Sequence, residues 1–168
     1  RGKRLMTSAG RTFASKVTRR IRGSKCRWLF DMAKGMFALV ELDDVVADSR
    51  HRASVDIEKD RIDMMAGDEL IYPTSRMLKG FYRSGIEIVL VTTKRLLKEE
   101  REVTRAWLSA HGVAYDYLVQ VESVEHLTRW IKDNQRENIL VMAICAGNKL
   151  ISMANNHPHK PHIYQVQR

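Results

Sequence analysis

Short apolar runs alternate along most of this chain with segments of helical spacing, and this alternation limits the folds that the chain can adopt. The runs are rich in Val, Ile and Leu and do not alternate cleanly between apolar and polar residues. This pattern is typical of strands that are buried on both faces of a parallel sheet. We predict five strands, at Met36–Leu42, Ile86–Thr92, Tyr117–Val121, Ile139–Ile144 and Ile163–Val166.

The segments between these runs predict helices over residues 73–84, 97–111, 123–130 and 148–154. Pro73 stands near the start of the first, and Gly85 and Gly112 follow the first two, where glycine commonly ends a helix. Strands and helices in this order imply right-handed crossovers and a three-layer, Rossmann-like α/β domain over residues 36–168. Residues 53–70 are charged and Met-rich, and we expect a small helical insertion there, after the first strand.

Residues 1–35 are predicted to form a basic N-terminal extension to this single domain. Residues 1–30 contain ten Lys or Arg and no acid, whereas residues 31–168 contain 19 basic and 20 acidic residues and so carry a net charge of −1. The whole positive excess of +9 therefore lies in the arm. The candidate nucleic-acid-binding residues are Arg11, Lys16, Arg19, Arg20, Arg22, Lys25 and Arg27.

Three interpretations of the arm stay open. Its Arg, Ser and Ala content, with Phe13, Val17 and Ile21 at four-residue spacing, is typical of mitochondrial transit peptides and indicates the mitochondrial matrix. It is equally typical of basic extensions that follow nucleic acid, in the cytoplasm or in a virion as well as in an organelle. The third interpretation is a solvated tail.

Two functional classes are disfavoured by composition. The two cysteines, Cys26 and Cys145, lie far apart without metal-type spacing, so we expect reduced thiols and no disulfide. No apolar stretch approaches the roughly 18 residues of a membrane-spanning helix, so no membrane partner is expected.

Residues 38–52 read ALVELDDVVADSRHR, a short apolar run that ends in three carboxylates. This stretch resembles hhxDhDGThADxxHR, the first motif of haloacid-dehalogenase-like (HAD) phosphatases of the phage and polynucleotide-phosphatase branch. Further resemblances follow in order. GIEIVLVTTKR at 85–95 resembles the second, VTRAWLSAHGVAYDYLV at 103–119 is similar to the segment that follows, and HIYQV at 162–166 is similar to the last strand. The resemblance covers about residues 36–167 and implies a HAD-like domain.

The resemblance also implies roles for individual positions. Glu41 stands at the position of the nucleophilic Asp, Asp43 at that of the general acid and base, and Asp44 where Gly is usual. Thr92 stands at the phosphate-binding position, followed by Thr93 and Lys94 where Gly and Arg are common. The Lys of the third motif falls near Leu127, with Lys132 close enough to leave the alignment open. The acids of the fourth motif are replaced by Cys145 and Ala146.

These departures indicate that catalysis has been lost. Magnesium takes oxygen ligands, which a thiol and a methyl group do not offer, so we expect no metal and no other cofactor. Glu41 extends its carboxylate by one methylene group, and Asp44 adds a negative side chain beside the site. Phosphoryl transfer depends on positioning and charge neutralisation, both of which are impaired here.

We therefore interpret the chain as a pseudophosphatase with vestigial site residues Glu41, Asp43, Thr92 and Lys94. We expect a structural subunit of a large ribonucleoprotein, with a mitochondrial ribosome or its assembly machinery as the first choice, and with rRNA and neighbouring proteins as partners. The alternatives are a nucleotide or polynucleotide phosphatase with an altered nucleophile, a module that holds a nucleotide, and a DNA-contacting structural protein of a phage particle.

Purely structural interpretations of individual residues also stay open. Glu41 and Asp43 could be solvated or paired with Lys94 or Arg95, and Thr92 could be a turn residue. Met64, Met65, Trp107 and Trp130 are expected in the core or at a partner contact. For the histidines at positions 157, 159 and 162, we expect an exposed connection and no metal.

Overall fold

The computed structural model describes residues 35–52, 58–92, 97–135 and 137–166. The basic arm, with its seven candidate residues, lies outside this part of the chain, as does Lys94. Five parallel strands form the central sheet in the order β5 (Tyr117–Gln120), β4 (Glu87–Thr92), β1 (Met36–Glu41), β6 (Ile139–Cys145) and β7 (His162–Gln165). All five predicted strands are confirmed to within a residue or two at their ends.

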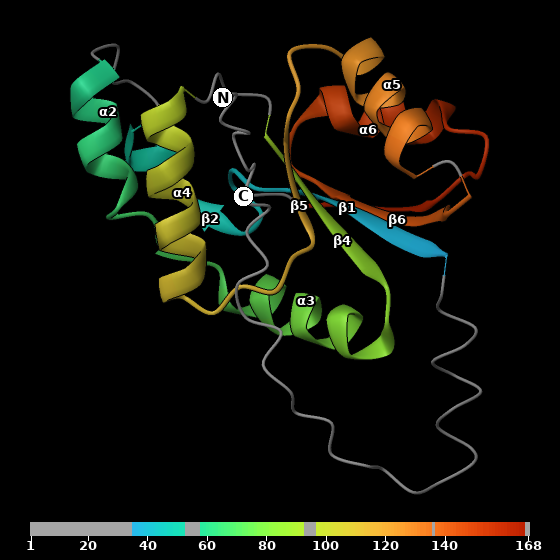
Figure 1. The fold of residues 1–168 in the computed structure, drawn as a ribbon, viewed down its shortest axis with the longest axis horizontal. Helices are drawn as coiled ribbons and strands as arrows, with labels where there is room; N and C mark the ends of the chain where they lie inside the picture. The colour runs from blue at the N-terminus through green and yellow to red at the C-terminus, as the bar shows by residue number, and fades with distance from the viewer. Residues whose placement is uncertain (1–34, 53–57, 93–96, 136, 167–168) are drawn as a thin grey trace, which may run out of the picture.

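Helices cover both faces of this sheet and make it the middle of three layers (Figure 1). Leu78 of α3 (Tyr72–Ser84) and Leu108 of α4 (Lys98–Ala110) pack on one face. Leu127 of α5 (Val124–Asn134) and Leu150 of α6 (Asn148–Asn156) pack on the other. The molecule has the predicted Rossmann-like, three-layer α/β fold.

The central strand shows why the apolar runs are continuous. Phe37 and Leu39 of β1 point into the cluster beneath α5 and α6, and Ala38 and Val40 point into the cluster beneath α3 and α4. All four are at most 2% exposed. A strand with no face in water has no position for a polar side chain, so its sequence lacks the alternation of a half-buried strand.

The helix ends follow local signals in the sequence. Pro73 occupies the first turn of α3, and Gly85 follows its last residue with φ of 79°, the left-handed conformation that glycine adopts without a steric cost. Ser123 caps α5, because its hydroxyl accepts a hydrogen bond from the backbone N–H of His126. α5 continues to Asn134, four residues beyond its predicted end.

The insertion after β1 contains the expected helix and, in addition, a short antiparallel ribbon. The short 3-10 helix η1 (Arg50–Arg52) and α2 (Glu58–Met65) are present, but β2 (Ala47–Asp48) also pairs with β3 (Glu69–Leu70) as an antiparallel ribbon. Two-residue strands are too short to leave a periodic pattern. α2 lies beside α4, at the end of the molecule where the first strand finishes (Figure 1).

The expected core placement of the large side chains is confirmed for two of them. Met65 and Trp107 are 5% and 6% exposed, while Met64 and Trp130 are half-buried. Within the described part of the chain, no helix is both long and apolar enough to cross a bilayer.

Candidate functional site

The residues predicted to form a site come from three adjacent strands that end at the same edge of the sheet. Glu41 is the last residue of β1, Thr92 the last of β4 and Cys145 the last of β6, and β1 is hydrogen-bonded to both neighbours. Asp43 lies two residues beyond the end of β1. The carboxyl ends of parallel strands are where ligands bind in sheets of this type, and the structure brings Glu41, Asp43 and Thr92 to this one edge.

The side chain of Glu41, at the nucleophile position of the motif that the sequence resembles, is hydrogen-bonded to the start of α6. Its Oε2 atom accepts hydrogen bonds of 2.8 Å from the backbone N–H groups of Ala146 and Gly147, and the side chain is 7% exposed. Gly147 is the residue directly before α6. The carboxylate therefore binds the unpaired amides at the positive end of a helix, as a bound anion would.

The length of the glutamate side chain and the glycine opposite it fit each other. A Cβ atom placed on Gly147 would lie 3.0 Å from Oε1 of Glu41, closer than carbon and oxygen normally approach. Gly147 has an ordinary φ of −89°, so the glycine serves the close approach and not an unusual backbone conformation. The β6–α6 turn is thus shaped around a carboxylate supplied by β1.

Asp43, at the position of the general acid and base, is also held by neighbouring groups. The Thr92 hydroxyl donates a 2.7 Å hydrogen bond to its Oδ2, and Nη2 of Arg52 donates one of 3.2 Å to its Oδ1. Asp43 is 7% exposed and Thr92 is fully buried. The interpretation of Glu41 and Asp43 as solvated acids is therefore wrong, and the cation that contacts Asp43 among the described residues is Arg52.

Arg52 links Asp43 to a second buried carboxylate in the insertion. Its Nε donates a 2.9 Å hydrogen bond to Oδ1 of Asp68 and its Nη2 one of 2.8 Å to Oδ2, a two-pronged pairing. Burial by itself lowers the pKa of Arg52, but hydrogen bonds and charge from Asp68 and then Asp43 outweigh it, so the pKa lies above its ordinary value. The guanidinium is a permanent internal cation between two acids.

The insertion is tied to α4 by the same group of residues. The indole N–H of Trp107 donates a 2.9 Å hydrogen bond to the backbone carbonyl of Asp68. Nε2 of His51 lies 3.5 Å from Oδ1 of the same Asp68. Sequence reasoning missed both Arg52 and Asp68 as site residues. Arg52 is the last residue of the ADxxHR part of the first motif, and that match could have identified it as a site residue. Asp68 is one acid among several in a charged segment, where no pattern distinguishes it.

Asp44, at a position where the resembled motif usually has glycine, has a backbone conformation that glycine adopts readily. Its φ is 64°, in the left-handed region that Asp and Asn tolerate better than most residues. Its Oδ1 accepts hydrogen bonds from the backbone N–H and the hydroxyl of Ser49, at 3.2 and 3.0 Å. The negative side chain is thereby engaged within its own turn.

The fourth-motif positions offer no ligand that suits magnesium. Cys145 is 1% exposed, and burial, followed by the negative charge of Glu41, raises the pKa of its thiol to about 12. Ala146 contributes only its backbone, and its N–H is directed at Glu41. Because Glu41 holds two amides and Asp43 holds Arg52, the donor groups that the structure describes at this edge do not fit a hard divalent cation.

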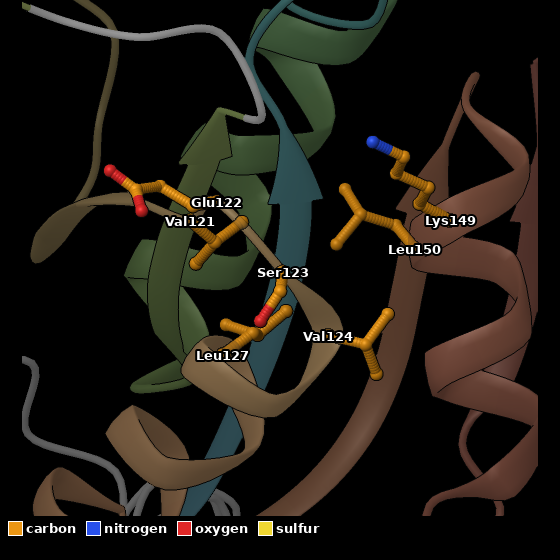
Figure 2. A pocket seen from close by; sticks show the side chains of 7 residues that line it. All are labelled: Val121, Glu122, Ser123, Val124, Leu127, Lys149 and Leu150. Atoms are coloured by element: carbon orange, nitrogen blue, oxygen red, sulfur yellow. The ribbon is translucent and has the colours of Figure 1, made fainter.

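Of the two candidates for the third-motif lysine, Leu127 carries no charge and Lys132 lies away from this edge of the sheet. Leu127, in the first turn of α5, is fully buried. It lines a small hollow together with residues from the starts of α5 and α6 (Figure 2). Lys132 is exposed in the last turn of α5, at the opposite end of that helix from Ser123, which follows β5. The hollow is also lined by the exposed Lys149, in the first turn of α6, a residue that the sequence did not single out.

The histidine-rich connection has a structural role. Nδ1 of His159 accepts a 3.0 Å hydrogen bond from the backbone N–H of Leu140, and the rings of His157 and His159 lie 4.9 Å apart. Burial, with a smaller effect of His159, lowers the pKa of His157. Across the described ranges, no group of three or more His, Cys, Asp or Glu side chains is arranged to bind a metal ion.

Comparison with known proteins supports the fold and little beyond it. No family model and no curated protein matches the chain. Two matching solved chains belong to structures of the Pnkp1/Rnl/Hen1 RNA repair complex, each with a TM-score of 0.63, 16% sequence identity and coverage of 79% of this chain. This chain spans 42% and 46% of those two chains, less than half of their length. At this identity the likeness establishes a shared three-layer α/β architecture.

Proposed function

We propose that this chain is a catalytically inactive HAD-like protein that serves as a structural subunit of a large ribonucleoprotein, anchored by its basic N-terminal arm. A mitochondrial ribosome or its assembly machinery is our first choice of assembly. The proposed loss of catalysis rests on one observation. The carboxylate of Glu41, at the nucleophile position, accepts two backbone hydrogen bonds of 2.8 Å from the start of α6.

A carboxylate in this arrangement is a poor nucleophile. To attack phosphorus, an oxygen of Glu41 would have to approach the phosphate with its lone pair available, and Oε2 already serves two amide donors. Releasing it would leave two amides without partners in a largely buried position, at a cost of about 1–3 kcal/mol for each. The remaining oxygen, Oε1, lies against Gly147.

The acid and base position is restrained as well. A general acid must carry a proton and a general base must take one up, and both need a carboxyl group that can exchange protons with the reacting atoms. Asp43 is buried between the Thr92 hydroxyl and the guanidinium of Arg52, and both of its carboxylate oxygens already accept hydrogen bonds from these groups. The Asp43 carboxylate is suited to holding the insertion in place through Arg52.

Association with RNA is supported by two further features. The arm, with ten cations and no acid in residues 1–30, is of the kind that binds a phosphate backbone without sequence preference. The fold is similar to that of chains found in an RNA repair complex. The transit-like composition of the arm is our reason for choosing the mitochondrion.

The loss of catalysis is tested by phosphatase assays with Mg²⁺ on p-nitrophenyl phosphate and on a 3′-phosphorylated RNA oligonucleotide. We expect wild-type protein, Glu41→Gln and the control Glu122→Gln, which changes an exposed acid, to give the rate measured without enzyme. Mg²⁺-dependent turnover that Glu41→Gln abolishes and Glu122→Gln retains would instead favour the phosphatase alternative.

The anchoring role of the arm is tested by co-sedimentation of the full-length chain with mitochondrial ribosomal particles. Changing the seven candidate arm residues to Gln should release the protein at a lower salt concentration than wild type. The matched control removes the same number of charges from exposed cations of the folded domain, namely Lys98, Arg101, Arg105, Arg129, Lys132, Lys149 and Lys160. Equal release of both variants would show that the arm is not the anchor.

A further inference from the structure

One helix of the folded domain carries an exposed row of cations that the proposed site does not use. Arg76, Lys79 and Arg83 of α3 follow Tyr72 at spacings of four, three and four residues, so all four side chains lie along one stripe of the helix. The opposite side of α3 buries Thr74, Ser75 and Leu78 against the domain. The stripe therefore faces away from the sheet and is open to solvent.

The charge of α3 differs from that of its surroundings. Its sequence, YPTSRMLKGFYRS, contains three cations and no acid, whereas α4 balances three cations with three glutamates. Within the described residues, none of the three cations of α3 forms an ion pair. A row of unneutralised cations on a domain with a net charge near −1 repels itself, and a polyanion placed along it would relieve that repulsion.

Exposed aromatic rings accompany the cations. Tyr72, at the start of the stripe, is 69% exposed, and Tyr82, beside Arg83, is 53% exposed. Tyr164 of β7 is 56% exposed, and its register partner Ile144 belongs to the cluster beneath α3 and α4, so Tyr164 lies on the same face of the sheet as α3. Exposed rings next to cations are the elements with which proteins stack and hold single-stranded nucleic acid.

The position of α3 also connects the stripe with the arm. Phe37 of β1 pairs with Glu87 of β4, so Gly35 and Gly85 lie at the amino ends of two adjacent strands. The arm joins the domain at Gly35, and Arg83 lies two residues before Gly85. α3 ends at that edge of the sheet and lies along the outside of the domain. No other labelled helix or strand lies on its outer side (Figure 1).

We propose that α3 is a second RNA-binding surface, on which Arg76, Lys79 and Arg83 contact consecutive phosphates of a single strand and Tyr72 and Tyr82 stack on its bases. The three cations span about 10 Å of the helix axis, enough for a few nucleotides. This inference rests on the proposed association of the chain with RNA. It adds that the folded domain, and not the arm alone, positions the strand.

The test uses full-length protein and a fluorescein-labelled, single-stranded oligouridylate, with the dissociation constant measured by anisotropy over a range of KCl concentrations. Changing Arg76, Lys79 and Arg83 together to Gln should weaken binding and reduce the slope of log K against log salt by about two, the value expected when three phosphate contacts are lost. The matched control changes Lys98, Arg101 and Arg105 of α4 to Gln and should leave the slope unchanged. Circular dichroism checks that both variants are folded.

The stacking contacts are tested separately from the charges. Tyr72→Leu and Tyr82→Leu should each weaken binding by about five-fold or more while the salt slope stays at its wild-type value, because a stacking contact releases no counterions. Unchanged affinity of both tyrosine variants would overturn the stacking part of the proposal.

The outcomes separate this inference from the proposed function. If wild-type protein binds the oligonucleotide and the α3 variant binds it with the same affinity and slope, this inference is wrong and the arm remains the proposed anchor. If the α3 variant keeps RNA affinity but leaves the ribosomal particle, α3 contacts a protein and the RNA proposal for it fails. If wild-type protein binds no RNA at all, both proposals fail.

Discussion

At the scale of single residues, the group with the largest energetic consequence is Arg52, which neutralises two carboxylates that have little access to water. Removing one partner of a buried charge network leaves the others uncompensated, which typically costs about 3–5 kcal/mol. We therefore predict that Arg52→Met lowers the free energy of unfolding by about that amount, measured by urea denaturation. The matched control is Arg50→Met, since Arg50 pairs with Asp48 in a largely exposed position and its loss should have little effect.

The same network allows a test of its cause. If the loss in Arg52→Met arises from unpaired carboxylates, adding Asp68→Asn to that variant should restore part of the stability, whereas Asp68→Asn alone should destabilise the wild type. Additive effects of the two changes would show that Arg52 and Asp68 act independently, in contradiction to the two hydrogen bonds between them.

The buried thiol of Cys145 predicts a dependence of stability on pH. Its pKa is about 12 in the folded protein, raised by burial and by Glu41, against an ordinary value of 9.0. Above pH 9 the unfolded chain releases this proton while the folded chain retains it, so stability falls as the pH rises from about 9 to about 12 and is unaffected by this group below that range. Urea denaturation of Cys145→Ala should show a shallower loss over this range; an identical loss would contradict the assignment.

At the scale of secondary-structure elements, Glu41 joins the central strand to the start of α6. We predict that Glu41→Asp, which introduces the residue type usual at the first position of the motif that this stretch resembles, destabilises the protein by about 1–3 kcal/mol because the shorter side chain no longer reaches both amides. It should produce no Mg²⁺-dependent phosphatase activity. Gained activity at unchanged stability would mean that the position still serves catalysis.

Gly147 provides an independent measure of this contact. Gly147→Ala should destabilise the wild type, since its new Cβ would lie 3.0 Å from the Glu41 carboxylate. The effect should be smaller in the Glu41→Asp background, where the carboxylate is withdrawn by one methylene group. Equal effects in both backgrounds, measured in a double-mutant cycle, would show that the two residues are not coupled.

The elements also show what the sequence could and could not predict. The five strands and four helices were predictable because burial on both faces and helical spacing extend over many residues. The ribbon of β2 and β3 was not, since two residues carry no period. The strand ends placed Glu41, Thr92 and Cys145 together, but the direction of the Glu41 side chain depends on the turn at Gly147, more than 100 residues away in sequence. The pairing of Arg52 with Asp68 likewise depends on how the insertion folds back.

At the scale of the whole molecule, three groups of cations have different roles. Arg52 is enclosed and serves the fold, α3 presents its cations to solvent, and the arm holds ten cations in residues 1–30. An active phosphatase of this type would need its positive charge at the carboxyl ends of the strands, next to the phosphate. Here Arg52, the cation that contacts Asp43 among the described residues, is already paired, and the exposed cations of α3 lie along the outside of the domain.

This division predicts that the folded protein gains no stability from magnesium. A ligand that binds only the folded state raises its stability by about 2.7 kcal/mol when present at 100 times its dissociation constant, which a thermal melt readily detects. Because Glu41 and Asp43 are engaged by amides and by Arg52, we expect the melting temperature in MgCl₂ to equal that in KCl of the same ionic strength. A rise specific to Mg²⁺ that disappears in Asp43→Asn would place a divalent cation at the strand ends, and the pseudophosphatase interpretation would then have to be abandoned.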